Sequence, residues 1–429
     1  MKLWDKGVST NALIEEFTVG RDREFDMLLA KHDVRGSIAH ATMLAEIGIL
    51  STDEGNALVQ ELHTIEQEIE NGLFAIAPEM EDVHSQVEYL LTQRLGEVGK
   101  KIHTGRSRND QVLVDMKLFM REELCNVRDC VSTLFTMLLA LAEQHKNQLL
   151  PGYTHFQIAM PSSFGLWFSA YAESLTDDME LIVAAHNVVN KNPLGSAAGY
   201  GSSFPLNRTR TTELLGFSAM NVSSVYAQMT RGKSERVVAT ALASVAGTLS
   251  KLAYDVCLYT SQNLAFVRLP AEFTTGSSIM PHKQNPDLFE LIRAKCNRLQ
   301  ALPNDILLVT NNLPSGYHRD FQILKELVFP AFTELQQCLQ LATLVLPQLQ
   351  VTPNIMNNDL YAYCFSVDAV NQLVQQGVSF RDAYKQIGES IQRGEFTVPE
   401  HLTHTHEGSI GNLRLDLIQQ QMQKVLSSM

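Results

Sequence analysis

Three long stretches of the 429-residue sequence contain neither glycine nor proline. They run over residues 106–150, 166–192 and 248–269 and are rich in Leu, Ala, Met, Glu and Lys. These residue types favour helix, and no Gly or Pro interrupts the backbone hydrogen bonding. Each stretch is longer than the usual globular helix of about 11–12 residues. The sequence therefore predicts unusually long helices.

The apolar pattern of the first stretch indicates how such helices pack. Near its start, Val112, Met116, Phe119 and Met120 recur at helical spacing. Toward Leu134 the stretch becomes apolar on nearly all sides, which is typical of a helix buried by other helices. Alternating strand patterns bounded by turn residues are weak. The predicted fold class is all-α, with a central bundle of long helices.

Shorter helical segments flank the long stretches and suggest three domains. We predict an N-terminal helical domain over residues 1–105, a central long-helix bundle over 106–352 and a small C-terminal helical domain over 353–429. The last domain follows Thr352-Pro353, and its segment SVDAVNQLVQQG is expected to form one helix. The central domain is expected to form the core of an oligomer and to carry the catalytic loop.

The net charge and the cysteine content limit the classes of binding partner and the cellular compartment that we expect for the protein. The net charge of −13 argues against nucleic acid and anionic membranes as partners, although a site can still be locally basic. The six cysteines form no CxxC pair, which fits a reducing compartment. The opening MKLWDKGVST has no apolar signal core, and LFTMLLALA (134–142) is too short to span a bilayer. We therefore expect a cytoplasmic protein that binds neither nucleic acid nor membrane.

Common cofactor motifs are absent from the sequence. It contains no GxxxxGK[ST] loop and no HExxH, and GYGSSF (199–204) lacks the third glycine of a dinucleotide fingerprint. His401, His404 and His406 are better explained as an exposed tail than as metal ligands, because no second cluster of Cys or His accompanies them. No GxSxG elbow indicates a serine hydrolase. We expect neither a metal nor an organic cofactor.

Three polar segments interrupt the helical pattern. HTGRSRNDQ (103–111) places two arginines where the longest helix begins, and both helix N-termini and arginines bind carboxylates. Helix capping alone needs only one Ser, Asp or Asn, so we favour a binding role. LPGYTHFQIAMPSS (150–163) holds His155 between two prolines, although a lone loop histidine is more often structural. TTGSSIMPHKQNPD (274–287) sets Lys283 beside small residues, which fits either an exposed loop or a catalytic lid.

The third polar segment resembles a known superfamily. Its core, GSSIMPHKQNP (276–286), is similar to the GSxxMPxKxNP pattern of the fumarase/aspartase superfamily, whose members release fumarate from succinyl compounds. Within that superfamily, HTGRSRNDQ and YHRDFQILKE (317–326) resemble the argininosuccinate lyase family. EDVH (81–84), GYTHFQ (152–157) and NPLGSAAGYGSSFPLNR (192–208) also fit, and the resemblance runs from about residue 2 to about residue 350.

The resemblance implies a fold, an assembly and a reaction. The family's protomer has three α-helical domains, its long helices form the core of a homotetramer, and each active site draws residues from three chains. The implied reaction splits argininosuccinate into arginine and fumarate by anti elimination, as a step of arginine biosynthesis, without a metal or organic cofactor. Two alternatives stay open: another fumarate-releasing lyase of the superfamily, and a non-catalytic helical scaffold similar to lens delta crystallins.

The resemblance also implies roles for individual residues. The implied catalytic residues are Ser277, His155, Lys283 and Glu290, and the implied substrate contacts are Arg108, Asn109, Thr154, Ser278, Asn285, Tyr317, Gln322 and Lys325. Ser277 is the implied base and His155 the implied general acid, with Glu290 as its charge partner. Lys283, Ser278 and Asn285 are implied to hold the carboxylates of the leaving fumarate.

The residue types suit this chemistry. Removing a proton beside a carboxylate gives an aci-carboxylate dianion, which Lys283 and Asn285 can stabilise. The guanidinium group of arginine leaves best when protonated, which suits an acid such as His155.

Three positions depart from the family pattern. Gln284 replaces a second lysine, and Gly232 follows Arg231 where the family has an aspartate. The N-terminal binding serine has no clear match, and Thr18 or a neighbour is the expected substitute.

Overall fold

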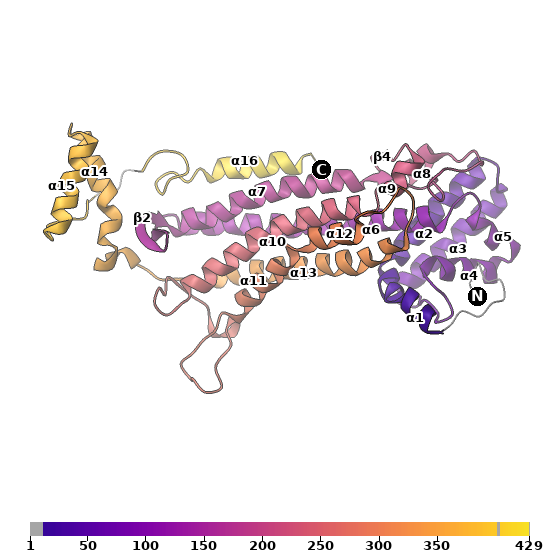
Figure 1. Ribbon diagram of the computed structural model, residues 1–429, viewed down its shortest axis with the longest axis horizontal. Coiled ribbons are helices and arrows are strands. Elements are labelled where there is room, and N and C mark those ends of the chain that lie inside the picture. Colours follow the sequence, from indigo (N-terminus) through magenta and orange to yellow (C-terminus); the bar gives the residue numbers. More distant parts are fainter. Residues whose placement is uncertain (1–11, 401–403, 429) are drawn as a thin grey trace.

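The computed structural model describes residues 12–400 and 404–428 and is predominantly helical (Figure 1). The α-helices are α1 (Ala12–Val19), α2 (Asp22–Glu46), α3 (Thr52–Glu70), α4 (Val83–Leu95), α5 (Glu97–Lys100), α6 (Arg108–Gln144), α7 (Phe164–Val189), α8 (Arg208–Leu214), α9 (Ser224–Met229), α10 (Lys233–Tyr259), α11 (Asp287–Leu299), α12 (Leu302–Thr310), α13 (Ile323–Val345), α14 (Ser366–Gln375), α15 (Phe380–Gln392) and α16 (Leu415–Leu426). The short strands are β1 (Leu149–Thr154), β2 (Gln157–Ser163), β3 (Lys191–Asn192), β4 (Ala219–Met220), β5 (Val267–Arg268) and β6 (Gln350–Val351). The predicted all-α class is confirmed.

The long helices run side by side as a bundle (Figure 1). α6 packs against α2, α7 and α13, and α10 packs against α7 and α11. Buried apolar side chains of these helices form one continuous core, which α16 joins by lying along α7 (Figure 1). The stretches 106–150 and 166–192 thus contain the two long helices that the sequence predicts, α6 and α7.

A capping box fixes the start of α6. The Ser107 hydroxyl accepts a hydrogen bond from the Asn109 N–H at 3.2 Å, and the Asp110 carboxylate accepts one from the Ser107 N–H at 2.9 Å. These bonds satisfy N–H groups that a helix N-terminus otherwise leaves free. The side chains of the first turn, Arg108 and Asn109, are therefore held in a defined position.

The third Gly- and Pro-free stretch does not stay helical. α10 ends at Tyr259, and the chain turns through Ser261-Gln262-Asn263 before β5 pairs with β6. Ser and Asn favour turns because their side chains bond to the nearby backbone. Burial of Phe266 then holds the turned segment against the core. The helix predicted over 248–269 is therefore wrong in its last part.

A β-hairpin replaces the loop predicted around His155. β1 and β2 pair antiparallel, with Pro151 opposite Pro161 and Thr154 opposite Gln157. The two-residue turn is His155-Phe156, with φ of 54° and 58°. Both values are left-handed, a conformation that hairpin turns usually assign to Asn or Gly. The hairpin therefore presents His155 at an exposed, constrained tip.

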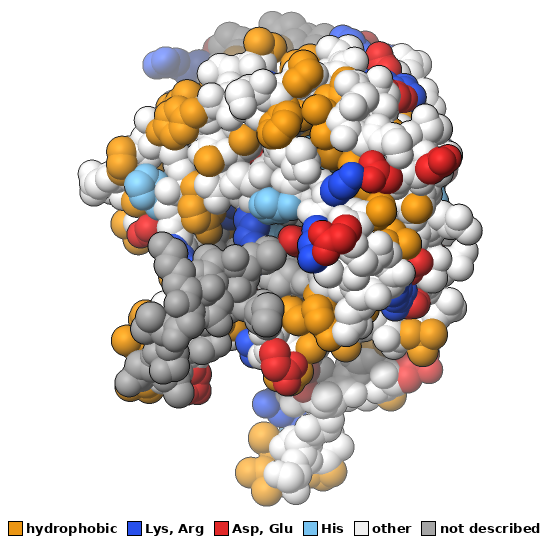
Figure 2. All heavy atoms as spheres, turned by 90° about the vertical axis from the view of Figure 1, so that its right-hand side faces the viewer, with side chains coloured by type: hydrophobic (Ala, Val, Ile, Leu, Met, Phe, Trp, Pro, Cys, Tyr) orange, Lys and Arg blue, Asp and Glu red, His pale blue; other side chains and the backbone are white. Residues whose placement is uncertain are grey.

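The N-terminal part has a core of its own. Buried side chains of α2, α3 and α4 form a second apolar cluster spanning residues 30–102. α2 also packs on α6, so the two cores share one wall. On the described part of this end of the molecule, basic side chains are interspersed with acidic ones (Figure 2). The predicted domain boundaries at residues 105 and 352 stay predictions.

The bundle keeps apolar surface after the protomer has packed. By length and composition α6 and α10 could cross a membrane, a test that core helices of soluble proteins also pass. In the most apolar window of α6, however, only 39% is buried. Large apolar side chains on the other bundle helices, among them Leu291, Leu308 and Leu344, are more than half exposed. Apolar side chains therefore remain on the surface of the bundle.

The start of α7 lies so close to the end of α6 that it requires glycine. A Cβ on Gly165 would lie 2.5 Å from the Lys146 Cα and 2.7 Å from the Ala142 carbonyl oxygen. We expect Gly165→Ala to lower the thermal midpoint, because overpacking costs ~1–3 kcal/mol. Gly388→Ala is the control, since that helical position has nothing within 4 Å of its Cβ. Circular dichroism melts check this, and equal melting of Gly165→Ala and wild type would contradict it.

Candidate active site

A cavity of about 240 Å³ lies where the N-terminal part meets the start of α6. Its lining comes from α2, from the residues around the starts of α4, α6 and α13, and from the segment before α10: Asp22, Asp26, Glu81, Asp82, His84, Arg108, Asn109, Val112, Arg231, Tyr317, Arg319, Gln322 and Lys325. Five of the predicted substrate contacts therefore lie in one cavity: Arg108, Asn109, Tyr317, Gln322 and Lys325. Segments more than 200 residues apart in sequence form this site.

Arg108 is the first residue of α6 and is fixed by the N-terminus of α4. Its guanidinium donates to the Asp82 carboxylate at 2.9 Å and to the Ser85 hydroxyl at 2.8 Å. The neighbouring Asp110 faces inward and accepts backbone N–H bonds from Gly195 and Ala197 at 2.9 and 2.8 Å. Burial raises the pKa of Asp110 to about 6, and the backbone hydrogen bonds oppose that rise. The result is a helix N-terminus suited to an anionic group.

Lys325 is a buried cation between two acids of α2. Its Nζ donates to the Asp26 carboxylate at 2.7 Å and lies 2.5 Å from an Asp22 oxygen. Burial alone would lower the pKa of Lys325, but Asp26 and Asp22 raise it above its ordinary value. Burial raises the pKa of Asp22 to about 6 even though Lys325 lowers it. The ammonium group is therefore charged at neutral pH.

Gln322 and Arg319 attach α1 to the rim of the cavity. The Gln322 amide donates to the carbonyl oxygens of Thr18 and Val19 at 3.0 and 3.2 Å. Arg319 donates to the same Thr18 carbonyl at 2.9 Å. Thr18, the expected substitute for the family's serine, therefore offers its backbone to this site, and its hydroxyl donates to the Ile14 carbonyl at 2.8 Å.

Sequence reasoning assigned no site role to several residues of this cavity: Asp22, Asp26, Glu81, Asp82, His84, Arg231 and Arg319. The EDVH motif contains three of them and could have indicated them. Arg231 is buried, donating to the Phe321 carbonyl at 3.0 Å and pairing with Glu235 at 3.2 Å.

The departure at Gly232 has a local cause. Gly232 has φ of 77°, and a Cβ there would lie 2.6 Å from Thr310 Cγ2. The aspartate typical of the family would clash at this position.

The other seven predicted site residues lie elsewhere in the protomer. Thr154 and His155 occupy the exposed hairpin tip. Ser277, Ser278, Lys283 and Asn285 lie on the loop before α11, and Glu290 lies on α11. The hairpin and this loop are at the opposite end of the bundle from α2–α5 (Figure 1). Among the described residues, His155 and Glu290 form no ion pair within one protomer.

The loop that carries Ser277 is closed at its base. Thr275 and Asn285 exchange backbone hydrogen bonds at 3.3 and 2.9 Å. Between them, the Ser277 hydroxyl accepts the Met280 N–H at 3.1 Å, and the Lys283 N–H donates to the Met280 carbonyl at 3.0 Å. Ser278 and Lys283 are exposed. This closed base and exposed tip form a loop that can cover a bound substrate.

Within the described residues, one group could hold a metal by proximity: Asp33, His84 and Asp115, whose ligand atoms lie within 4.8 Å of one another. The Asp33 oxygen nearest the imidazole already accepts hydrogen bonds from His84 Nδ1 at 2.8 Å and from the Gln111 amide at 2.7 Å. His84 Nδ1 and this Asp33 oxygen are thus already bonded to each other, which fits a hydrogen-bonded cluster better than a metal site.

The histidine tail prediction is wrong for one residue. His404 is partly buried and its Nε2 lies 2.7 Å from an Asp368 carboxylate oxygen, so it is not a free exposed side chain. His406 is exposed, as predicted. His401 lies outside the described residues.

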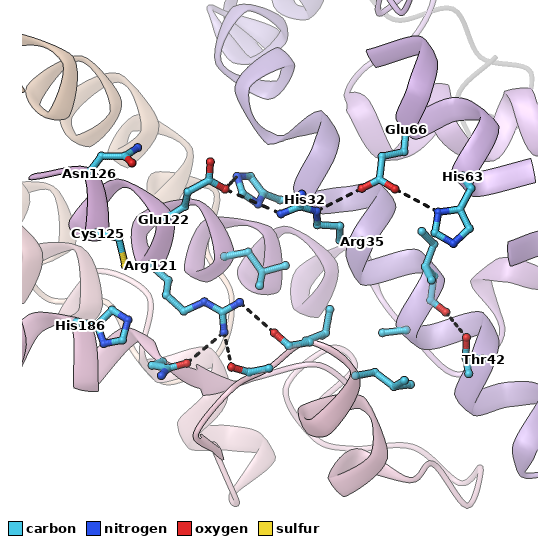
Figure 3. A pocket seen from close by; sticks show the side chains of 17 residues that line it. His32, Arg35, Thr42, His63, Glu66, Arg121, Glu122, Cys125, Asn126 and His186 are labelled. Carbon is cyan, nitrogen blue, oxygen red and sulfur yellow. Dashed lines mark hydrogen bonds and ion pairs between the residues drawn. The ribbon is translucent and has the colours of Figure 1, made fainter. Parts of the chain in front are cut away.

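A larger cavity of about 680 Å³ lies between α2, α3, α6 and α7 and contains none of the predicted site residues (Figure 3). The charged side chains that line this cavity pair with other residues of the same lining. Arg35 lies 3.3 Å from Glu66 and 4.0 Å from Glu122, and Arg121 donates to the carbonyl oxygens of Leu215 and Gly216 at 2.9 Å (Figure 3). These pairings favour a structural role for the cavity's charges.

Comparison with known proteins identifies the family. A family profile described as a lyase matches residues 6–301. The argininosuccinate lyase of Bacteroides thetaiotaomicron is 60% identical over 99% of this chain and 95% of its own length. The argininosuccinate lyase of Parabacteroides distasonis is 57% identical over 100% of this chain and 96% of its own length. That of Stenotrophomonas maltophilia is 40% identical over 96% of this chain and 97% of its own length. The chain belongs to the argininosuccinate lyase family.

Solved structures confirm the fold predicted for an argininosuccinate lyase. An EDDS lyase variant with bound fumarate matches with a TM-score of 0.76 at 22% identity, over 98% of this chain and 91% of that one. A class II fumarase from Schistosoma mansoni matches with a TM-score of 0.73 at 16% identity, over 89% of each chain. The predicted fumarase/aspartase-like protomer is therefore confirmed, and the chain is a lyase by family.

The buried Lys325 predicts a pH-dependent stability effect. Lys325→Met leaves Asp22 and Asp26 facing each other without a cation, which should cost ~3–5 kcal/mol of unfolding free energy at pH 8. The folded-state pKa of Asp22 is about 6, above its ordinary value, so its contribution favours folding at low pH and is lost as the pH rises through that value. The loss caused by Lys325→Met should therefore be smaller at pH 5 than at pH 8.

Urea unfolding of Lys325→Met and wild type at both pH values measures this effect. Lys295→Met is the control, because Lys295 forms a partly exposed pair with Glu334 at 3.5 Å and should matter by less than about 1 kcal/mol. An equal loss at pH 5 and pH 8 for Lys325→Met would contradict the assigned ion pair.

Proposed function

We propose that this protein cleaves argininosuccinate into arginine and fumarate by anti elimination, as a step of arginine biosynthesis. The observation that carries the proposal is the cavity at the start of α6, which gathers Arg108, Asn109, Tyr317, Gln322 and Lys325. These residues are implied substrate contacts by resemblance. Relatives named argininosuccinate lyase match nearly the whole chain at up to 60% identity, which supports the same substrate.

The charges of the cavity suit the amino-acid end of argininosuccinate. That end carries an α-carboxylate and an α-ammonium group close together. The start of α6 offers Arg108 and Asn109 to the carboxylate. Glu81 and Asp82 lie in the same lining and give it negative charge, which attracts the ammonium group. A cavity with both signs of charge suits a zwitterion better than a simple anion.

The elimination is proposed to take place on the loop before α11. Ser277 removes the proton from the carbon beside a carboxylate of the succinyl part. The electron pair moves into that carboxylate, and Lys283, Ser278 and Asn285 stabilise the resulting dianion. The carbon–nitrogen bond then breaks to form fumarate, and the departing guanidinium nitrogen takes a proton from His155. Glu290 is proposed as the charge partner of His155.

These residues can meet only if several copies of the chain combine. Arg108 begins α6, whereas His155 follows its C-terminal end, and a helix of 37 residues is about 55 Å long at 1.5 Å per residue. We therefore propose a homotetramer in which each site takes the cavity, the hairpin and the Ser277 loop from different chains. The exposed apolar side chains of the bundle support such an assembly. We also propose that the protein is cytoplasmic. The six free cysteines of the chain fit that location, because a reducing compartment keeps thiols unpaired.

A substrate panel tests the reaction. We expect fumarate, followed by its ultraviolet absorbance, to appear with argininosuccinate but not with adenylosuccinate, aspartate or malate. Fumarate from one of the other compounds would instead indicate a different lyase of the superfamily. No fumarate from any of them, with a folded oligomer, would indicate a non-catalytic scaffold.

Subunit complementation tests the shared site. Ser277→Ala should lose roughly 10²–10⁴-fold in kcat if the serine is the base, and His155→Asn is expected to be similarly impaired. After subunit exchange between the two variants, some sites contain neither change, so activity should return to a measurable fraction of wild type. Each variant exchanged with itself is the control. Verified mixed oligomers without recovered activity would contradict the shared site.

A further inference from the structure

His84 forms part of the wall of the candidate cavity, and the proposed chemistry gives it no role. It lies in the first turn of α4 and is only 6% exposed. Its Nδ1 donates to the Asp33 carboxylate at 2.8 Å and lies 3.6 Å from an Asp115 oxygen. Both acids are fully buried. One side of the ring is thus fixed by acids, while the same ring contributes to the cavity lining.

The protons of this cluster can be assigned from its contacts. The Asp33 oxygen bonded to His84 also accepts from Gln111, whereas both oxygens of Asp115 lack a hydrogen-bond partner among the described residues. Burial raises the pKa of Asp115 well above its ordinary value, and the Asp33 charge adds to the rise. Burial would also raise the pKa of Asp33, but His84 and Arg106 hold it below the ordinary value. Asp115 is therefore the neutral acid and Asp33 the carboxylate.

The imidazole carries the matching positive charge. Burial alone would lower the pKa of His84, but the Asp33 carboxylate, followed by Asp82, raises it to about 9. The other charged or titratable groups that act on this cluster are Asp26 from α2, Glu88 from α4, His103 and Arg106 from the segment before α6, and Arg108 from its first turn. At neutral pH both ring nitrogens then carry protons.

The second ring nitrogen, Nε2, is available to a ligand on the described part of the cavity wall. Nδ1 is taken by Asp33, and among the described residues Nε2 makes no hydrogen bond. The nearby acids of the cavity are engaged elsewhere: Asp82 accepts from Arg108 at 2.9 Å, and Asp26 accepts from Lys325 at 2.7 Å. A charged donor on the cavity wall is therefore left for a ligand.

We propose that His84 is a fixed cation of the substrate cavity, which Asp33 keeps protonated and oriented so that Nε2 donates a charge-assisted hydrogen bond to a carboxylate of the bound amino acid. This inference rests on the proposed function, which fills the cavity with the amino-acid end of argininosuccinate. His84 is a binding residue in this arrangement, and Asp33 is the positioning residue behind it. Asp115 is a neutral acid in this arrangement, so it does not set the charge of the His84 imidazole.

Two isosteric substitutions separate this role from simple stabilisation of the fold. Asp33→Asn removes the carboxylate that holds the proton, so His84 should be neutral at pH 8 and regain its charge at pH 6. We expect the KM for argininosuccinate to rise on the order of tenfold or more at pH 8, as for loss of a charge-assisted hydrogen bond, and to return toward wild type at pH 6. Asp115→Asn replaces a neutral acid by a neutral amide and should keep the wild-type dependence of KM on pH.

His84→Gln supplies a second test that does not depend on the pKa of the imidazole. A glutamine retains an N–H donor without the charge, so KM should rise at pH 6 and pH 8 alike, with kcat less affected. An unchanged KM in His84→Gln, or a KM in Asp33→Asn that is raised equally at both pH values, overturns the proposal. The same pH dependence in Asp115→Asn also overturns it, because that acid would then carry the charge.

Calorimetry with arginine separates failure of this inference from failure of the proposed function. Arginine presents the same α-carboxylate without needing turnover. If wild type releases no fumarate, the proposed function fails, but the variants can still be compared by their arginine affinity at pH 6 and pH 8. We expect Asp33→Asn to bind arginine about tenfold more weakly than wild type at pH 8 only. Equal weakening at both pH values, or none in a folded variant, overturns the role of His84.

Discussion

The length and rigidity of α6 constrain every other part of this molecule. Its 37 residues run uninterrupted from the Ser107 cap to Gln144. The N-terminal turn forms one wall of the candidate cavity, and the C-terminal end leads into the β1–β2 hairpin. A continuous helix holds its two ends about 55 Å apart. Under the proposed function, the site then needs the hairpin of another copy of the chain, because one protomer holds its own hairpin far from its own cavity.

The same helix links packing to chemistry. α6 contains an 18-residue window apolar enough to be buried on all sides, yet only 39% of that window is buried within its own protomer. In the proposed tetramer, the copies that cover the remaining surface would also determine which hairpin and which Ser277 loop approach the cavity. In this arrangement, assembly and catalysis would depend on one set of apolar contacts. A substitution on the exposed bundle surface could then reduce activity without touching a site residue.

The sequence predicted the helices well where local composition alone determines the secondary structure. Stretches without Gly or Pro became α6 and α7, because a long amphipathic or apolar run has few other ways to satisfy its backbone. The secondary-structure prediction failed where contacts between distant segments determine the local structure. Pro151 faces Pro161 in a hairpin, and neither proline reveals that partner locally. The end of α10 depends on Phe266 reaching the core, which is also a tertiary event.

The residues of the candidate site also divide into those that the sequence predicted and those that it missed. Arg108, Tyr317 and Lys325 were indicated by motifs, which preserve local spacing. Asp22 and Asp26 were not, because they belong to an ordinary helix and acquire their role only when Lys325 lies between them. Burial and partners, which set the charge of such groups, cannot be read from residue type.

Buried acids recur around the cavity, and their arrangement suggests what they contribute. Asp26 faces Lys325, Asp33 faces His84, and Asp110 faces backbone N–H groups. Burying a carboxylate beside a cation gives little net stability, because desolvation offsets most of the attraction. It does fix the cation in one rotamer with one charge state before the ligand arrives. A substrate with several charges then meets groups that need no reorganisation, and its binding free energy is not reduced by ordering them. Stability alone would favour apolar side chains at these positions, so the buried pairs fit the proposed role in ligand recognition.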